Sequence, residues 1–175
     1  MKLRKINILT AIVLGAVITF TACSKDDGAI PDNIGIEDVP AVSINLESGA
    51  IAGTITFADQ AAFQAKFKVS MYFANAIAPT KVDIVARKKN GTVGSVKLFK
   101  ADVASLPANF TITAAELATL FGTPFVLKDT CEIGPDIYVG TKKYEAFPIT
   151  GLGSGQGVTG MSAIGFGAQL TFIVK

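Results

Sequence analysis

The sequence contains no histidine and no tryptophan. Histidine is the commonest general base near neutral pH, the usual activator of serine and cysteine nucleophiles, and the commonest metal ligand. Its absence argues against most hydrolytic and metal-dependent chemistry, so we expect a protein that is not an enzyme and that holds neither a metal nor a cofactor. Without tryptophan, a stacking surface for sugar rings has to be built from other aromatic residues.

Charged residues are also scarce, at 17% of the chain, whereas 50% of the residues are hydrophobic. This balance excludes an intrinsically disordered chain, and 175 residues are enough for one ordinary domain with a buried core. The formal charge of +2 depends on Lys2, Arg4 and Lys5, because without them 13 basic residues face 14 acidic ones and the net charge is −1. Such a chain lacks the basic field that nucleic acids require, so no nucleic-acid partner is expected.

The N-terminal segment has the architecture of a signal peptide. A basic start is followed by an uncharged stretch up to Ala22, which is too short for a membrane-spanning helix of about 20 apolar residues. The tetrad Phe20-Thr21-Ala22-Cys23 resembles the lipobox of bacterial lipoproteins, although Phe20 replaces the usual leucine. The resemblance implies that residues 1–22 are removed and that Cys23 is acylated. The alternative is an ordinary signal peptide cut nearby, which the large Phe20 disfavours.

The residues that follow the cysteine carry a second signal. Ser24, Lys25, Asp26 and Asp27 look like the export signal of surface-exposed Bacteroidetes lipoproteins, with a solvated linker cluster as the alternative. By this resemblance the lipid anchors the protein in the outer membrane, facing the cell exterior. Residues 23–40 have no helical or strand period, so we predict a flexible tether before a folded domain at 41–175.

From Ala41 onwards, apolar and polar residues alternate with a period of two in short runs, which is typical of half-buried β-strands. The apolar positions are Val42, Ile44 and Leu46; Ile55 and Phe57; Phe67, Val69, Met71 and Phe73; Val82, Ile84 and Ala86; Val96 and Leu98; Phe110 and Ile112; Cys131 and Ile133; Ile137 and Val139; and Leu170, Phe172 and Val174. Asn90-Gly91 between two runs signals a β-hairpin, because both turn positions favour a positive φ. The runs predict roughly seven to nine antiparallel strands in a sandwich or a barrel.

One short helix is predicted over residues 113–121. Thr113 and Glu116 have the spacing of a capping box, and Gly122 is a typical helix end. The apolar stripe of this helix consists of Leu117, Leu120 and Phe121. Because a helix of about two turns is marginal alone, we expect this stripe to pack onto the sheets and to bridge the two layers.

The second half of the chain resembles a known lipoprotein module. The matching segments are Lys81–Val85, Asn90-Gly91, Lys97–Lys100, Leu106–Thr113, Glu116–Gly122, Leu127–Asp129 and Gly140–Phe147. They resemble the immunoglobulin-like module of Bacteroidetes surface lipoproteins and are similar to the N-terminal domains of SusE/SusF-type proteins from polysaccharide-utilisation systems. The resemblance implies an all-β, immunoglobulin-like antiparallel β-sandwich and partners such as a glycan, a TonB-dependent transporter or a sister lipoprotein. In that family the N-terminal module is often a spacer, and glycan binding lies in further C-terminal modules.

Three aromatic residues are candidates for glycan contact. Tyr72, Phe99 and Tyr138 fall opposite the core-facing positions of their runs, where exposed rings could stack on sugar faces. The sequence therefore favours a non-enzymatic surface lipoprotein that acts as a glycan-binding or spacer module. The alternative is a structural or adhesion module that contacts another protein.

Other motifs have structural interpretations. Arg87–Lys89 is predicted to be a solvated hairpin tip, with contact to acidic sugars as the alternative. Cys131, in phase with Ile133, is predicted to be a small core residue, since no basic or helix-terminal setting for a reactive thiol is visible. The glycines of 155–160 match the Gly-x-Gly-x-x-Gly pattern of dinucleotide folds, but no helix can follow them, so we interpret 151–167 as a mobile contact loop.

Overall fold

The computed structural model describes residues 39–149 and 165–175. The predicted signal peptide, Cys23, the export residues Ser24–Asp27 and almost all of the tether lie outside these described residues, as does most of the predicted loop at 151–167. Among the helices that are described, none is both long and apolar enough to cross a membrane.

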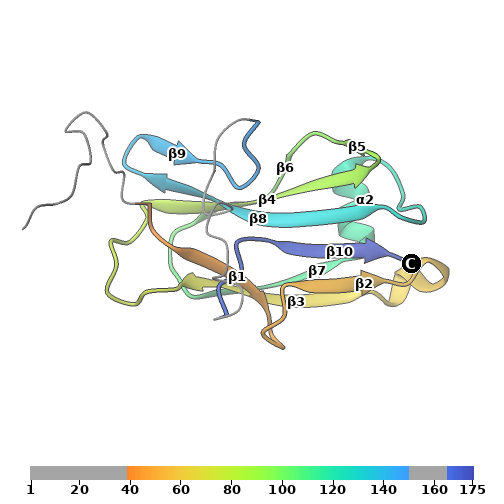
Figure 1. The fold of residues 1–175 in the computed structure, drawn as a ribbon, viewed down its shortest axis with the longest axis horizontal. Coiled ribbons are helices and arrows are strands. Elements are labelled where there is room, and N and C mark those ends of the chain that lie inside the picture. The colour runs from red at the N-terminus through yellow and green to blue at the C-terminus, as the bar shows by residue number, and fades with distance from the viewer. Residues whose placement is uncertain (1–38, 150–164) are drawn as a thin grey trace, which may run out of the picture. The chain divides into compact units, whose positions relative to one another are not determined.

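The described residues form two β-sheets that pack face to face (Figure 1). In chain order the elements are β1 (Val42–Leu46), β2 (Ala52–Ile55), the 3₁₀-helix η1 (Phe57–Ala62), β3 (Gln64–Met71), β4 (Lys81–Asn90), β5 (Thr92–Val93), β6 (Lys97–Val103), β7 (Ala108–Thr113), α2 (Ala114–Phe121), β8 (Thr130–Val139), β9 (Lys142–Tyr144) and β10 (Leu170–Val174). The smaller sheet has the order β1-β3-β7, and the larger has β2-β10-β8-β4-β5, with β6 also paired to β4 and β9 to β8. The predicted all-β sandwich is confirmed, although β10 and β2 pair in parallel.

The core between the sheets is built largely by the alternating apolar positions that the sequence predicts. Its contributors from the smaller sheet are Val42, Ile44, Phe67, Val69 and Ile112, and those from the larger sheet are Val82, Ile84, Ala86, Cys131, Ile133, Ile137, Leu170, Phe172 and Val174. Complete burial of a large apolar side chain stabilises the fold by about 1.5–3 kcal/mol. A slip of one residue would move the core-facing side chains of a strand to its solvent-facing side, so this burial also fixes the register of each strand.

Two predicted core positions lie at the surface because their strands are shorter than the alternation. Phe57 belongs to η1 rather than to β2 and is 42% exposed. Phe73 follows the end of β3 and is 55% exposed. The prediction that these two rings lie in the core is therefore wrong.

The alternation of β6 is inverted relative to the prediction. Phe99 packs against the core, whereas Leu98 and the preceding Val96 are 53% and 43% exposed. The pairing of β6 with β4 shifts register twice between Val82 and Val85. A shift of one residue exchanges the two faces of a strand, and here Leu98 lies opposite Val85 on the outer face of the larger sheet. Phe99 therefore does not present an outward ring.

The short helix is confirmed as α2. The Thr113 hydroxyl accepts a hydrogen bond from the Glu116 backbone N–H at 3.2 Å, and the Glu116 carboxylate accepts one from the Thr113 backbone N–H at 2.8 Å. Gly122 ends the helix with a left-handed φ of 69°. The helix contacts β7 of the smaller sheet and β6 of the larger one, so it bridges the two layers as expected.

The prediction of a solvated Arg87–Lys89 tip is wrong, because acidic side chains bind all three cations. Arg87 Nε lies 2.6 Å from one carboxylate oxygen of Glu132, and Lys89 pairs with the other oxygen. On the opposite face of β4, Lys88 Nζ lies 3.6 Å from a carboxylate oxygen of Asp129. Glu132 is only 5% exposed, so its charge is held by its partners rather than by water.

The Asn90-Gly91 hairpin is confirmed, but with a different turn. β4 and β5 pair across it with Asn90 opposite Thr92. Of the two turn residues only Gly91 has a positive φ, of 71°. The Asn90 side chain donates instead to an Asp129 carboxylate oxygen at 2.7 Å, which ties the hairpin to the segment before β8.

Candidate functional site

The three predicted glycan-contact residues do not form one platform. The Tyr72 ring packs edge-on against Phe73 and Phe166 beside the smaller sheet. Tyr138 lies on the outer face of the larger sheet, with Lys81 Nζ 4.5 Å from its ring centroid. Because Phe99 turns inward, the predicted rings are divided between the surfaces of different sheets and the core.

Cys131 occupies the predicted core position. Its side chain is fully buried between the sheets and forms no disulfide. Burial raises the pKa of its thiol far above the ordinary value, with a further contribution from the nearby Glu132 carboxylate. The thiol is therefore held protonated at neutral pH and is a packing group rather than a nucleophile.

One hollow, which we name the η1 cleft, lies between β2, η1 and β3. It has a volume of about 630 Å³, and its lining includes Glu47, Gly53, Thr54, Asp59, Phe63, Gln64, Lys66 and Phe172. Clefts of a few hundred to a thousand Å³ are the usual size for small-ligand sites. Sequence patterns do not predict this site, because its lining comes from β2, η1, β3 and β10, which only the fold brings together.

Two aromatic rings form the apolar part of the η1 cleft. Phe63 and Phe172 meet edge to face, with ring centroids 5.2 Å apart and an interplanar angle of 78°. Gly53 of β2 leaves room for this pair, because a Cβ atom at Gly53 would lie 3.0 Å from the Phe172 ring. A half-buried ring, Phe63, is thereby held in place by a fully buried one.

The polar part of the η1 cleft has unused hydrogen-bonding capacity. The side chains of Glu47, Thr54, Asp59, Gln64 and Lys66 line the cleft, and within the described residues none of them has a side-chain hydrogen bond or ion pair. Two carboxylates and one ammonium give this lining a net charge of −1. Donors and acceptors without internal partners are the groups that a bound ligand can engage.

A second hollow, which we name the β4–β8 cleft, lies on the outer face of the larger sheet. It has a volume of about 390 Å³ and combines the polar residues Asp83, Asp136, Tyr138, Lys143 and Glu145 with the apolar residues Val85, Val96, Leu98, Phe147 and Ile149. Asp83 of β4 and Asp136 of β8 face each other directly in the strand register. Strand pairing thus brings together acidic residues that lie far apart in the sequence.

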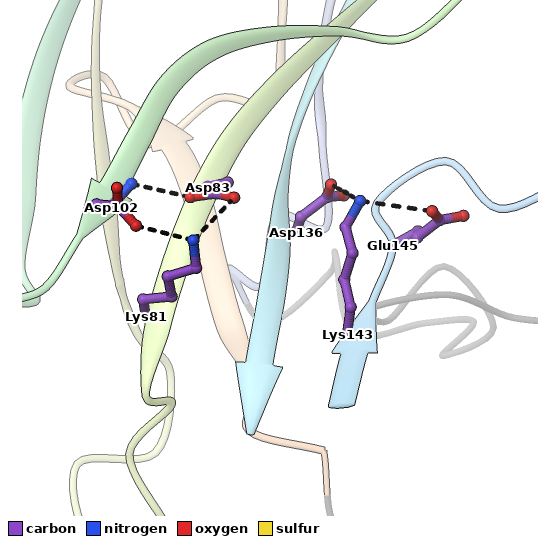
Figure 2. Close-up of polar contacts among 6 residues, drawn as sticks. All are labelled: Lys81, Asp83, Asp102, Asp136, Lys143 and Glu145. Atoms are coloured by element: carbon purple, nitrogen blue, oxygen red, sulfur yellow. Dashed lines mark hydrogen bonds and ion pairs between the residues drawn. The ribbon is translucent and has the colours of Figure 1, made fainter. Parts of the chain in front are cut away.

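Two lysines organise the charges around the β4–β8 cleft (Figure 2). Lys81 Nζ lies 2.8 Å from Asp102 and 3.5 Å from Asp83, and the Asp102 backbone N–H donates to Asp83 at 2.8 Å. Asp102 has a left-handed φ of 54°, a conformation that aspartate tolerates better than most residues. The two contacts to Asp102 join β4 to β6, so they tie this edge strand to the sheet.

The second lysine ties the segment after β8 to the same face (Figure 2). Lys143 Nζ lies 2.8 Å from Asp136 and 3.4 Å from Glu145. The Ala146 backbone N–H donates to Asp136 at 2.7 Å. This arrangement places residues 145–147 over β8. The buried ring of Phe147 lies beneath Arg87, whose guanidinium carbon is 4.3 Å from the ring centroid.

The contacts in the β4–β8 cleft hold its side chains in defined charge states. Burial is the largest influence on Asp83 and raises its pKa, but the hydrogen bonds from Asp102 and Tyr138 and the charge of Lys81 together bring it below the ordinary value. The hydrogen bond to Asp136, partly opposed by burial, raises the pKa of Lys143. Burial and the hydrogen bond to Asp83 raise the pKa of Tyr138. Near neutral pH, Asp83 is therefore negatively charged, Lys143 is positively charged and Tyr138 is neutral.

Neither a metal-binding group among the described residues nor a matching protein identifies a ligand for these clefts. Within residues 39–149 and 165–175, no group of three or more acidic or cysteine side chains is placed to hold a metal ion. Comparisons with protein-family models, with curated proteins and with solved structures found no match.

Proposed function

We propose that this chain is a non-enzymatic, lipid-anchored module of the outer cell surface that binds a neutral glycan in the η1 cleft. Its setting is a polysaccharide-utilisation system, as the resemblance of residues 81–147 to surface lipoprotein modules implies. The acyl anchor is proposed at Cys23 and the export signal at Ser24–Asp27.

The composition of the η1 cleft is the observation that carries the proposal. A sugar presents an apolar face of C–H groups and a rim of hydroxyls that both donate and accept hydrogen bonds. Phe63 offers an aromatic surface to the apolar face of the sugar. Thr54, Gln64 and their neighbours offer polar groups to its hydroxyls. The net charge of −1 in the lining disfavours an acidic sugar, so the proposed ligand is uncharged.

The carboxylates of the β4–β8 cleft are arranged for ion pairing rather than for glycoside hydrolysis. A glycosidase needs one carboxylic acid whose pKa is raised so that it can protonate the leaving group. Asp83 and Asp136 stand opposite each other but each is paired with a lysine, and the pKa of Asp83 is lowered. These groups suit structural ion pairing.

Calorimetric titration of the detergent-solubilised full-length protein with a panel of neutral and acidic polysaccharides tests the proposal. We expect a neutral glycan to bind, and Gln64→Ala and Thr54→Ala each to weaken it by about two- to tenfold, the effect of one lost hydrogen bond. Lys68→Ala, on the same strand but outside the η1 cleft, is the matched control and should bind normally. Binding that none of the cleft variants alters would refute the assignment.

A further inference from the structure

We infer that the β4–β8 cleft is a docking surface for an extended segment of a partner protein, one that presents a cationic side chain beside aliphatic ones. The inference is independent of glycan binding in the η1 cleft, because the two clefts share no lining residue.

The first observation is the exposure of aliphatic side chains in the cleft. Val96 and Leu98 are 43% and 53% exposed, and Ile149 is completely exposed. All three line one hollow together with the buried Val85 and Phe147. Clustered exposed aliphatic groups with a charged rim are characteristic of surfaces that bind other proteins.

The second observation is an excess of negative charge. The six residues of Figure 2 comprise four carboxylates and two lysines, so they carry a net charge of −2. Each lysine is shared between a buried and a more exposed carboxylate, and the exposed ones are Asp102 and Glu145, whose side chains are 73% and 50% exposed. Of these two, Glu145 lines the cleft. Its carboxylate retains room for an additional cation, which makes the surface complementary to a positively charged partner.

The third observation is that the surface is preformed and has an open strand edge. Asp83, Asp136 and Tyr138 are already hydrogen-bonded within the chain, so they need no rearrangement to receive a partner. Among the described strands, β6 pairs only with β4, so no other described strand occupies its second edge. A sugar fits this surface poorly, because Lys81 and Arg87 cover ring faces of Tyr138 and Phe147.

Peptide titration of the detergent-solubilised full-length protein tests the chemistry of the cleft. The probes are three blocked heptapeptides of sequence Leu-Ser-Val-X-Val-Ser-Leu in which X is arginine, glutamine or glutamate. We expect the arginine peptide to bind, the glutamine peptide to bind about three- to fivefold more weakly, and the glutamate peptide not to bind. Added salt should weaken the binding of the arginine peptide more than that of the glutamine peptide.

Two variants and a control locate the binding. Leu98→Ser and Glu145→Gln should each weaken the binding of the arginine peptide by about three- to fivefold. Neither should lower the melting temperature, since both side chains are substantially exposed. Glu47→Gln, which lies in the η1 cleft, should bind it normally. Equal binding of all three peptides, or insensitivity to Leu98→Ser, would overturn the inference. Self-association that Leu98→Ser abolishes would also overturn it, because the occupant would then be a second copy.

Discussion

Asp83 of β4 and Asp136 of β8 are directly opposite each other in an antiparallel ladder, and both are buried. Like charges in this relation destabilise a sheet unless something neutralises them. Here separate lysines do so from different elements, Lys81 from within β4 and Lys143 from β9. The ion pairs therefore make a closely paired strand register compatible with two facing carboxylates.

Removal of Lys143 is expected to destabilise the fold. In Lys143→Met, Asp136 keeps the Ala146 N–H but loses its counter-ion while it still faces Asp83. We expect a loss of about 1–3 kcal/mol in the free energy of unfolding, less than for a completely buried pair because Lys143 is partly exposed to solvent. Urea denaturation measures it, with the exposed Lys68→Met as the control. A double variant that adds Asp136→Asn should recover part of the loss, and no recovery would contradict the pairing.

The lowered pKa of Asp83 predicts a specific dependence of stability on pH. Burial alone would raise this pKa, but the Asp102 and Tyr138 hydrogen bonds and Lys81 bring it below the ordinary value of 3.8. A carboxyl group whose folded pKa is lowered contributes stability that is complete above its unfolded pKa and is lost as the pH falls towards the folded pKa. We therefore expect the difference in unfolding free energy between the wild type and Asp83→Asn to be constant above about pH 5 and to shrink below about pH 4.

Chemical denaturation at a series of pH values measures that difference. Asp59→Asn is the matched control, because it removes a carboxylate that has no side-chain partner among the described residues. A difference that grows as the solution becomes more acidic would contradict the direction assigned to Asp83.

Much of the core could be predicted from sequence because its signal is local. Val82, Ile84 and Ala86 alternate within one strand, and the Thr113–Glu116 spacing marks the start of α2 within one turn. Such patterns depend on the chain's own period, so they need no knowledge of the partner strand.

The candidate sites could not be predicted in the same way because they depend on pairing between distant segments. Alternation alone places Asp83 and Asp136 on the outer faces of their strands, but only the β4–β8 register makes them neighbours. The inward turn of Phe99 likewise depends on two register shifts against β4. In the η1 cleft, Phe63 acquires its role through Phe172, which comes from the other end of the chain.

Gly134 is expected to resist substitution because it makes room for the segment that covers β8. A Cβ atom at this position would lie 2.9 Å from the Ala146 Cβ and 3.4 Å from the Phe147 ring. We expect Gly134→Ala to lower the free energy of unfolding by about 1–3 kcal/mol, the usual cost of overpacking. Adding Ala146→Gly should restore part of it, as denaturation midpoints would show. An unchanged midpoint for Gly134→Ala would mean that residues 145–147 do not pack on β8.

The proposed anchor makes a prediction about covalent mass. If residues 1–22 are removed and Cys23 is acylated, intact-mass spectrometry of protein from native membranes should show a chain that begins at Cys23 and carries the mass of several acyl groups. Each buried CH₂ contributes about 0.8 kcal/mol, so several chains hold the protein on the membrane where one would not. Cys23→Ala should retain the signal peptide and lack the lipid mass. A mature chain that begins at another residue, or one without added lipid, would contradict the proposed anchor.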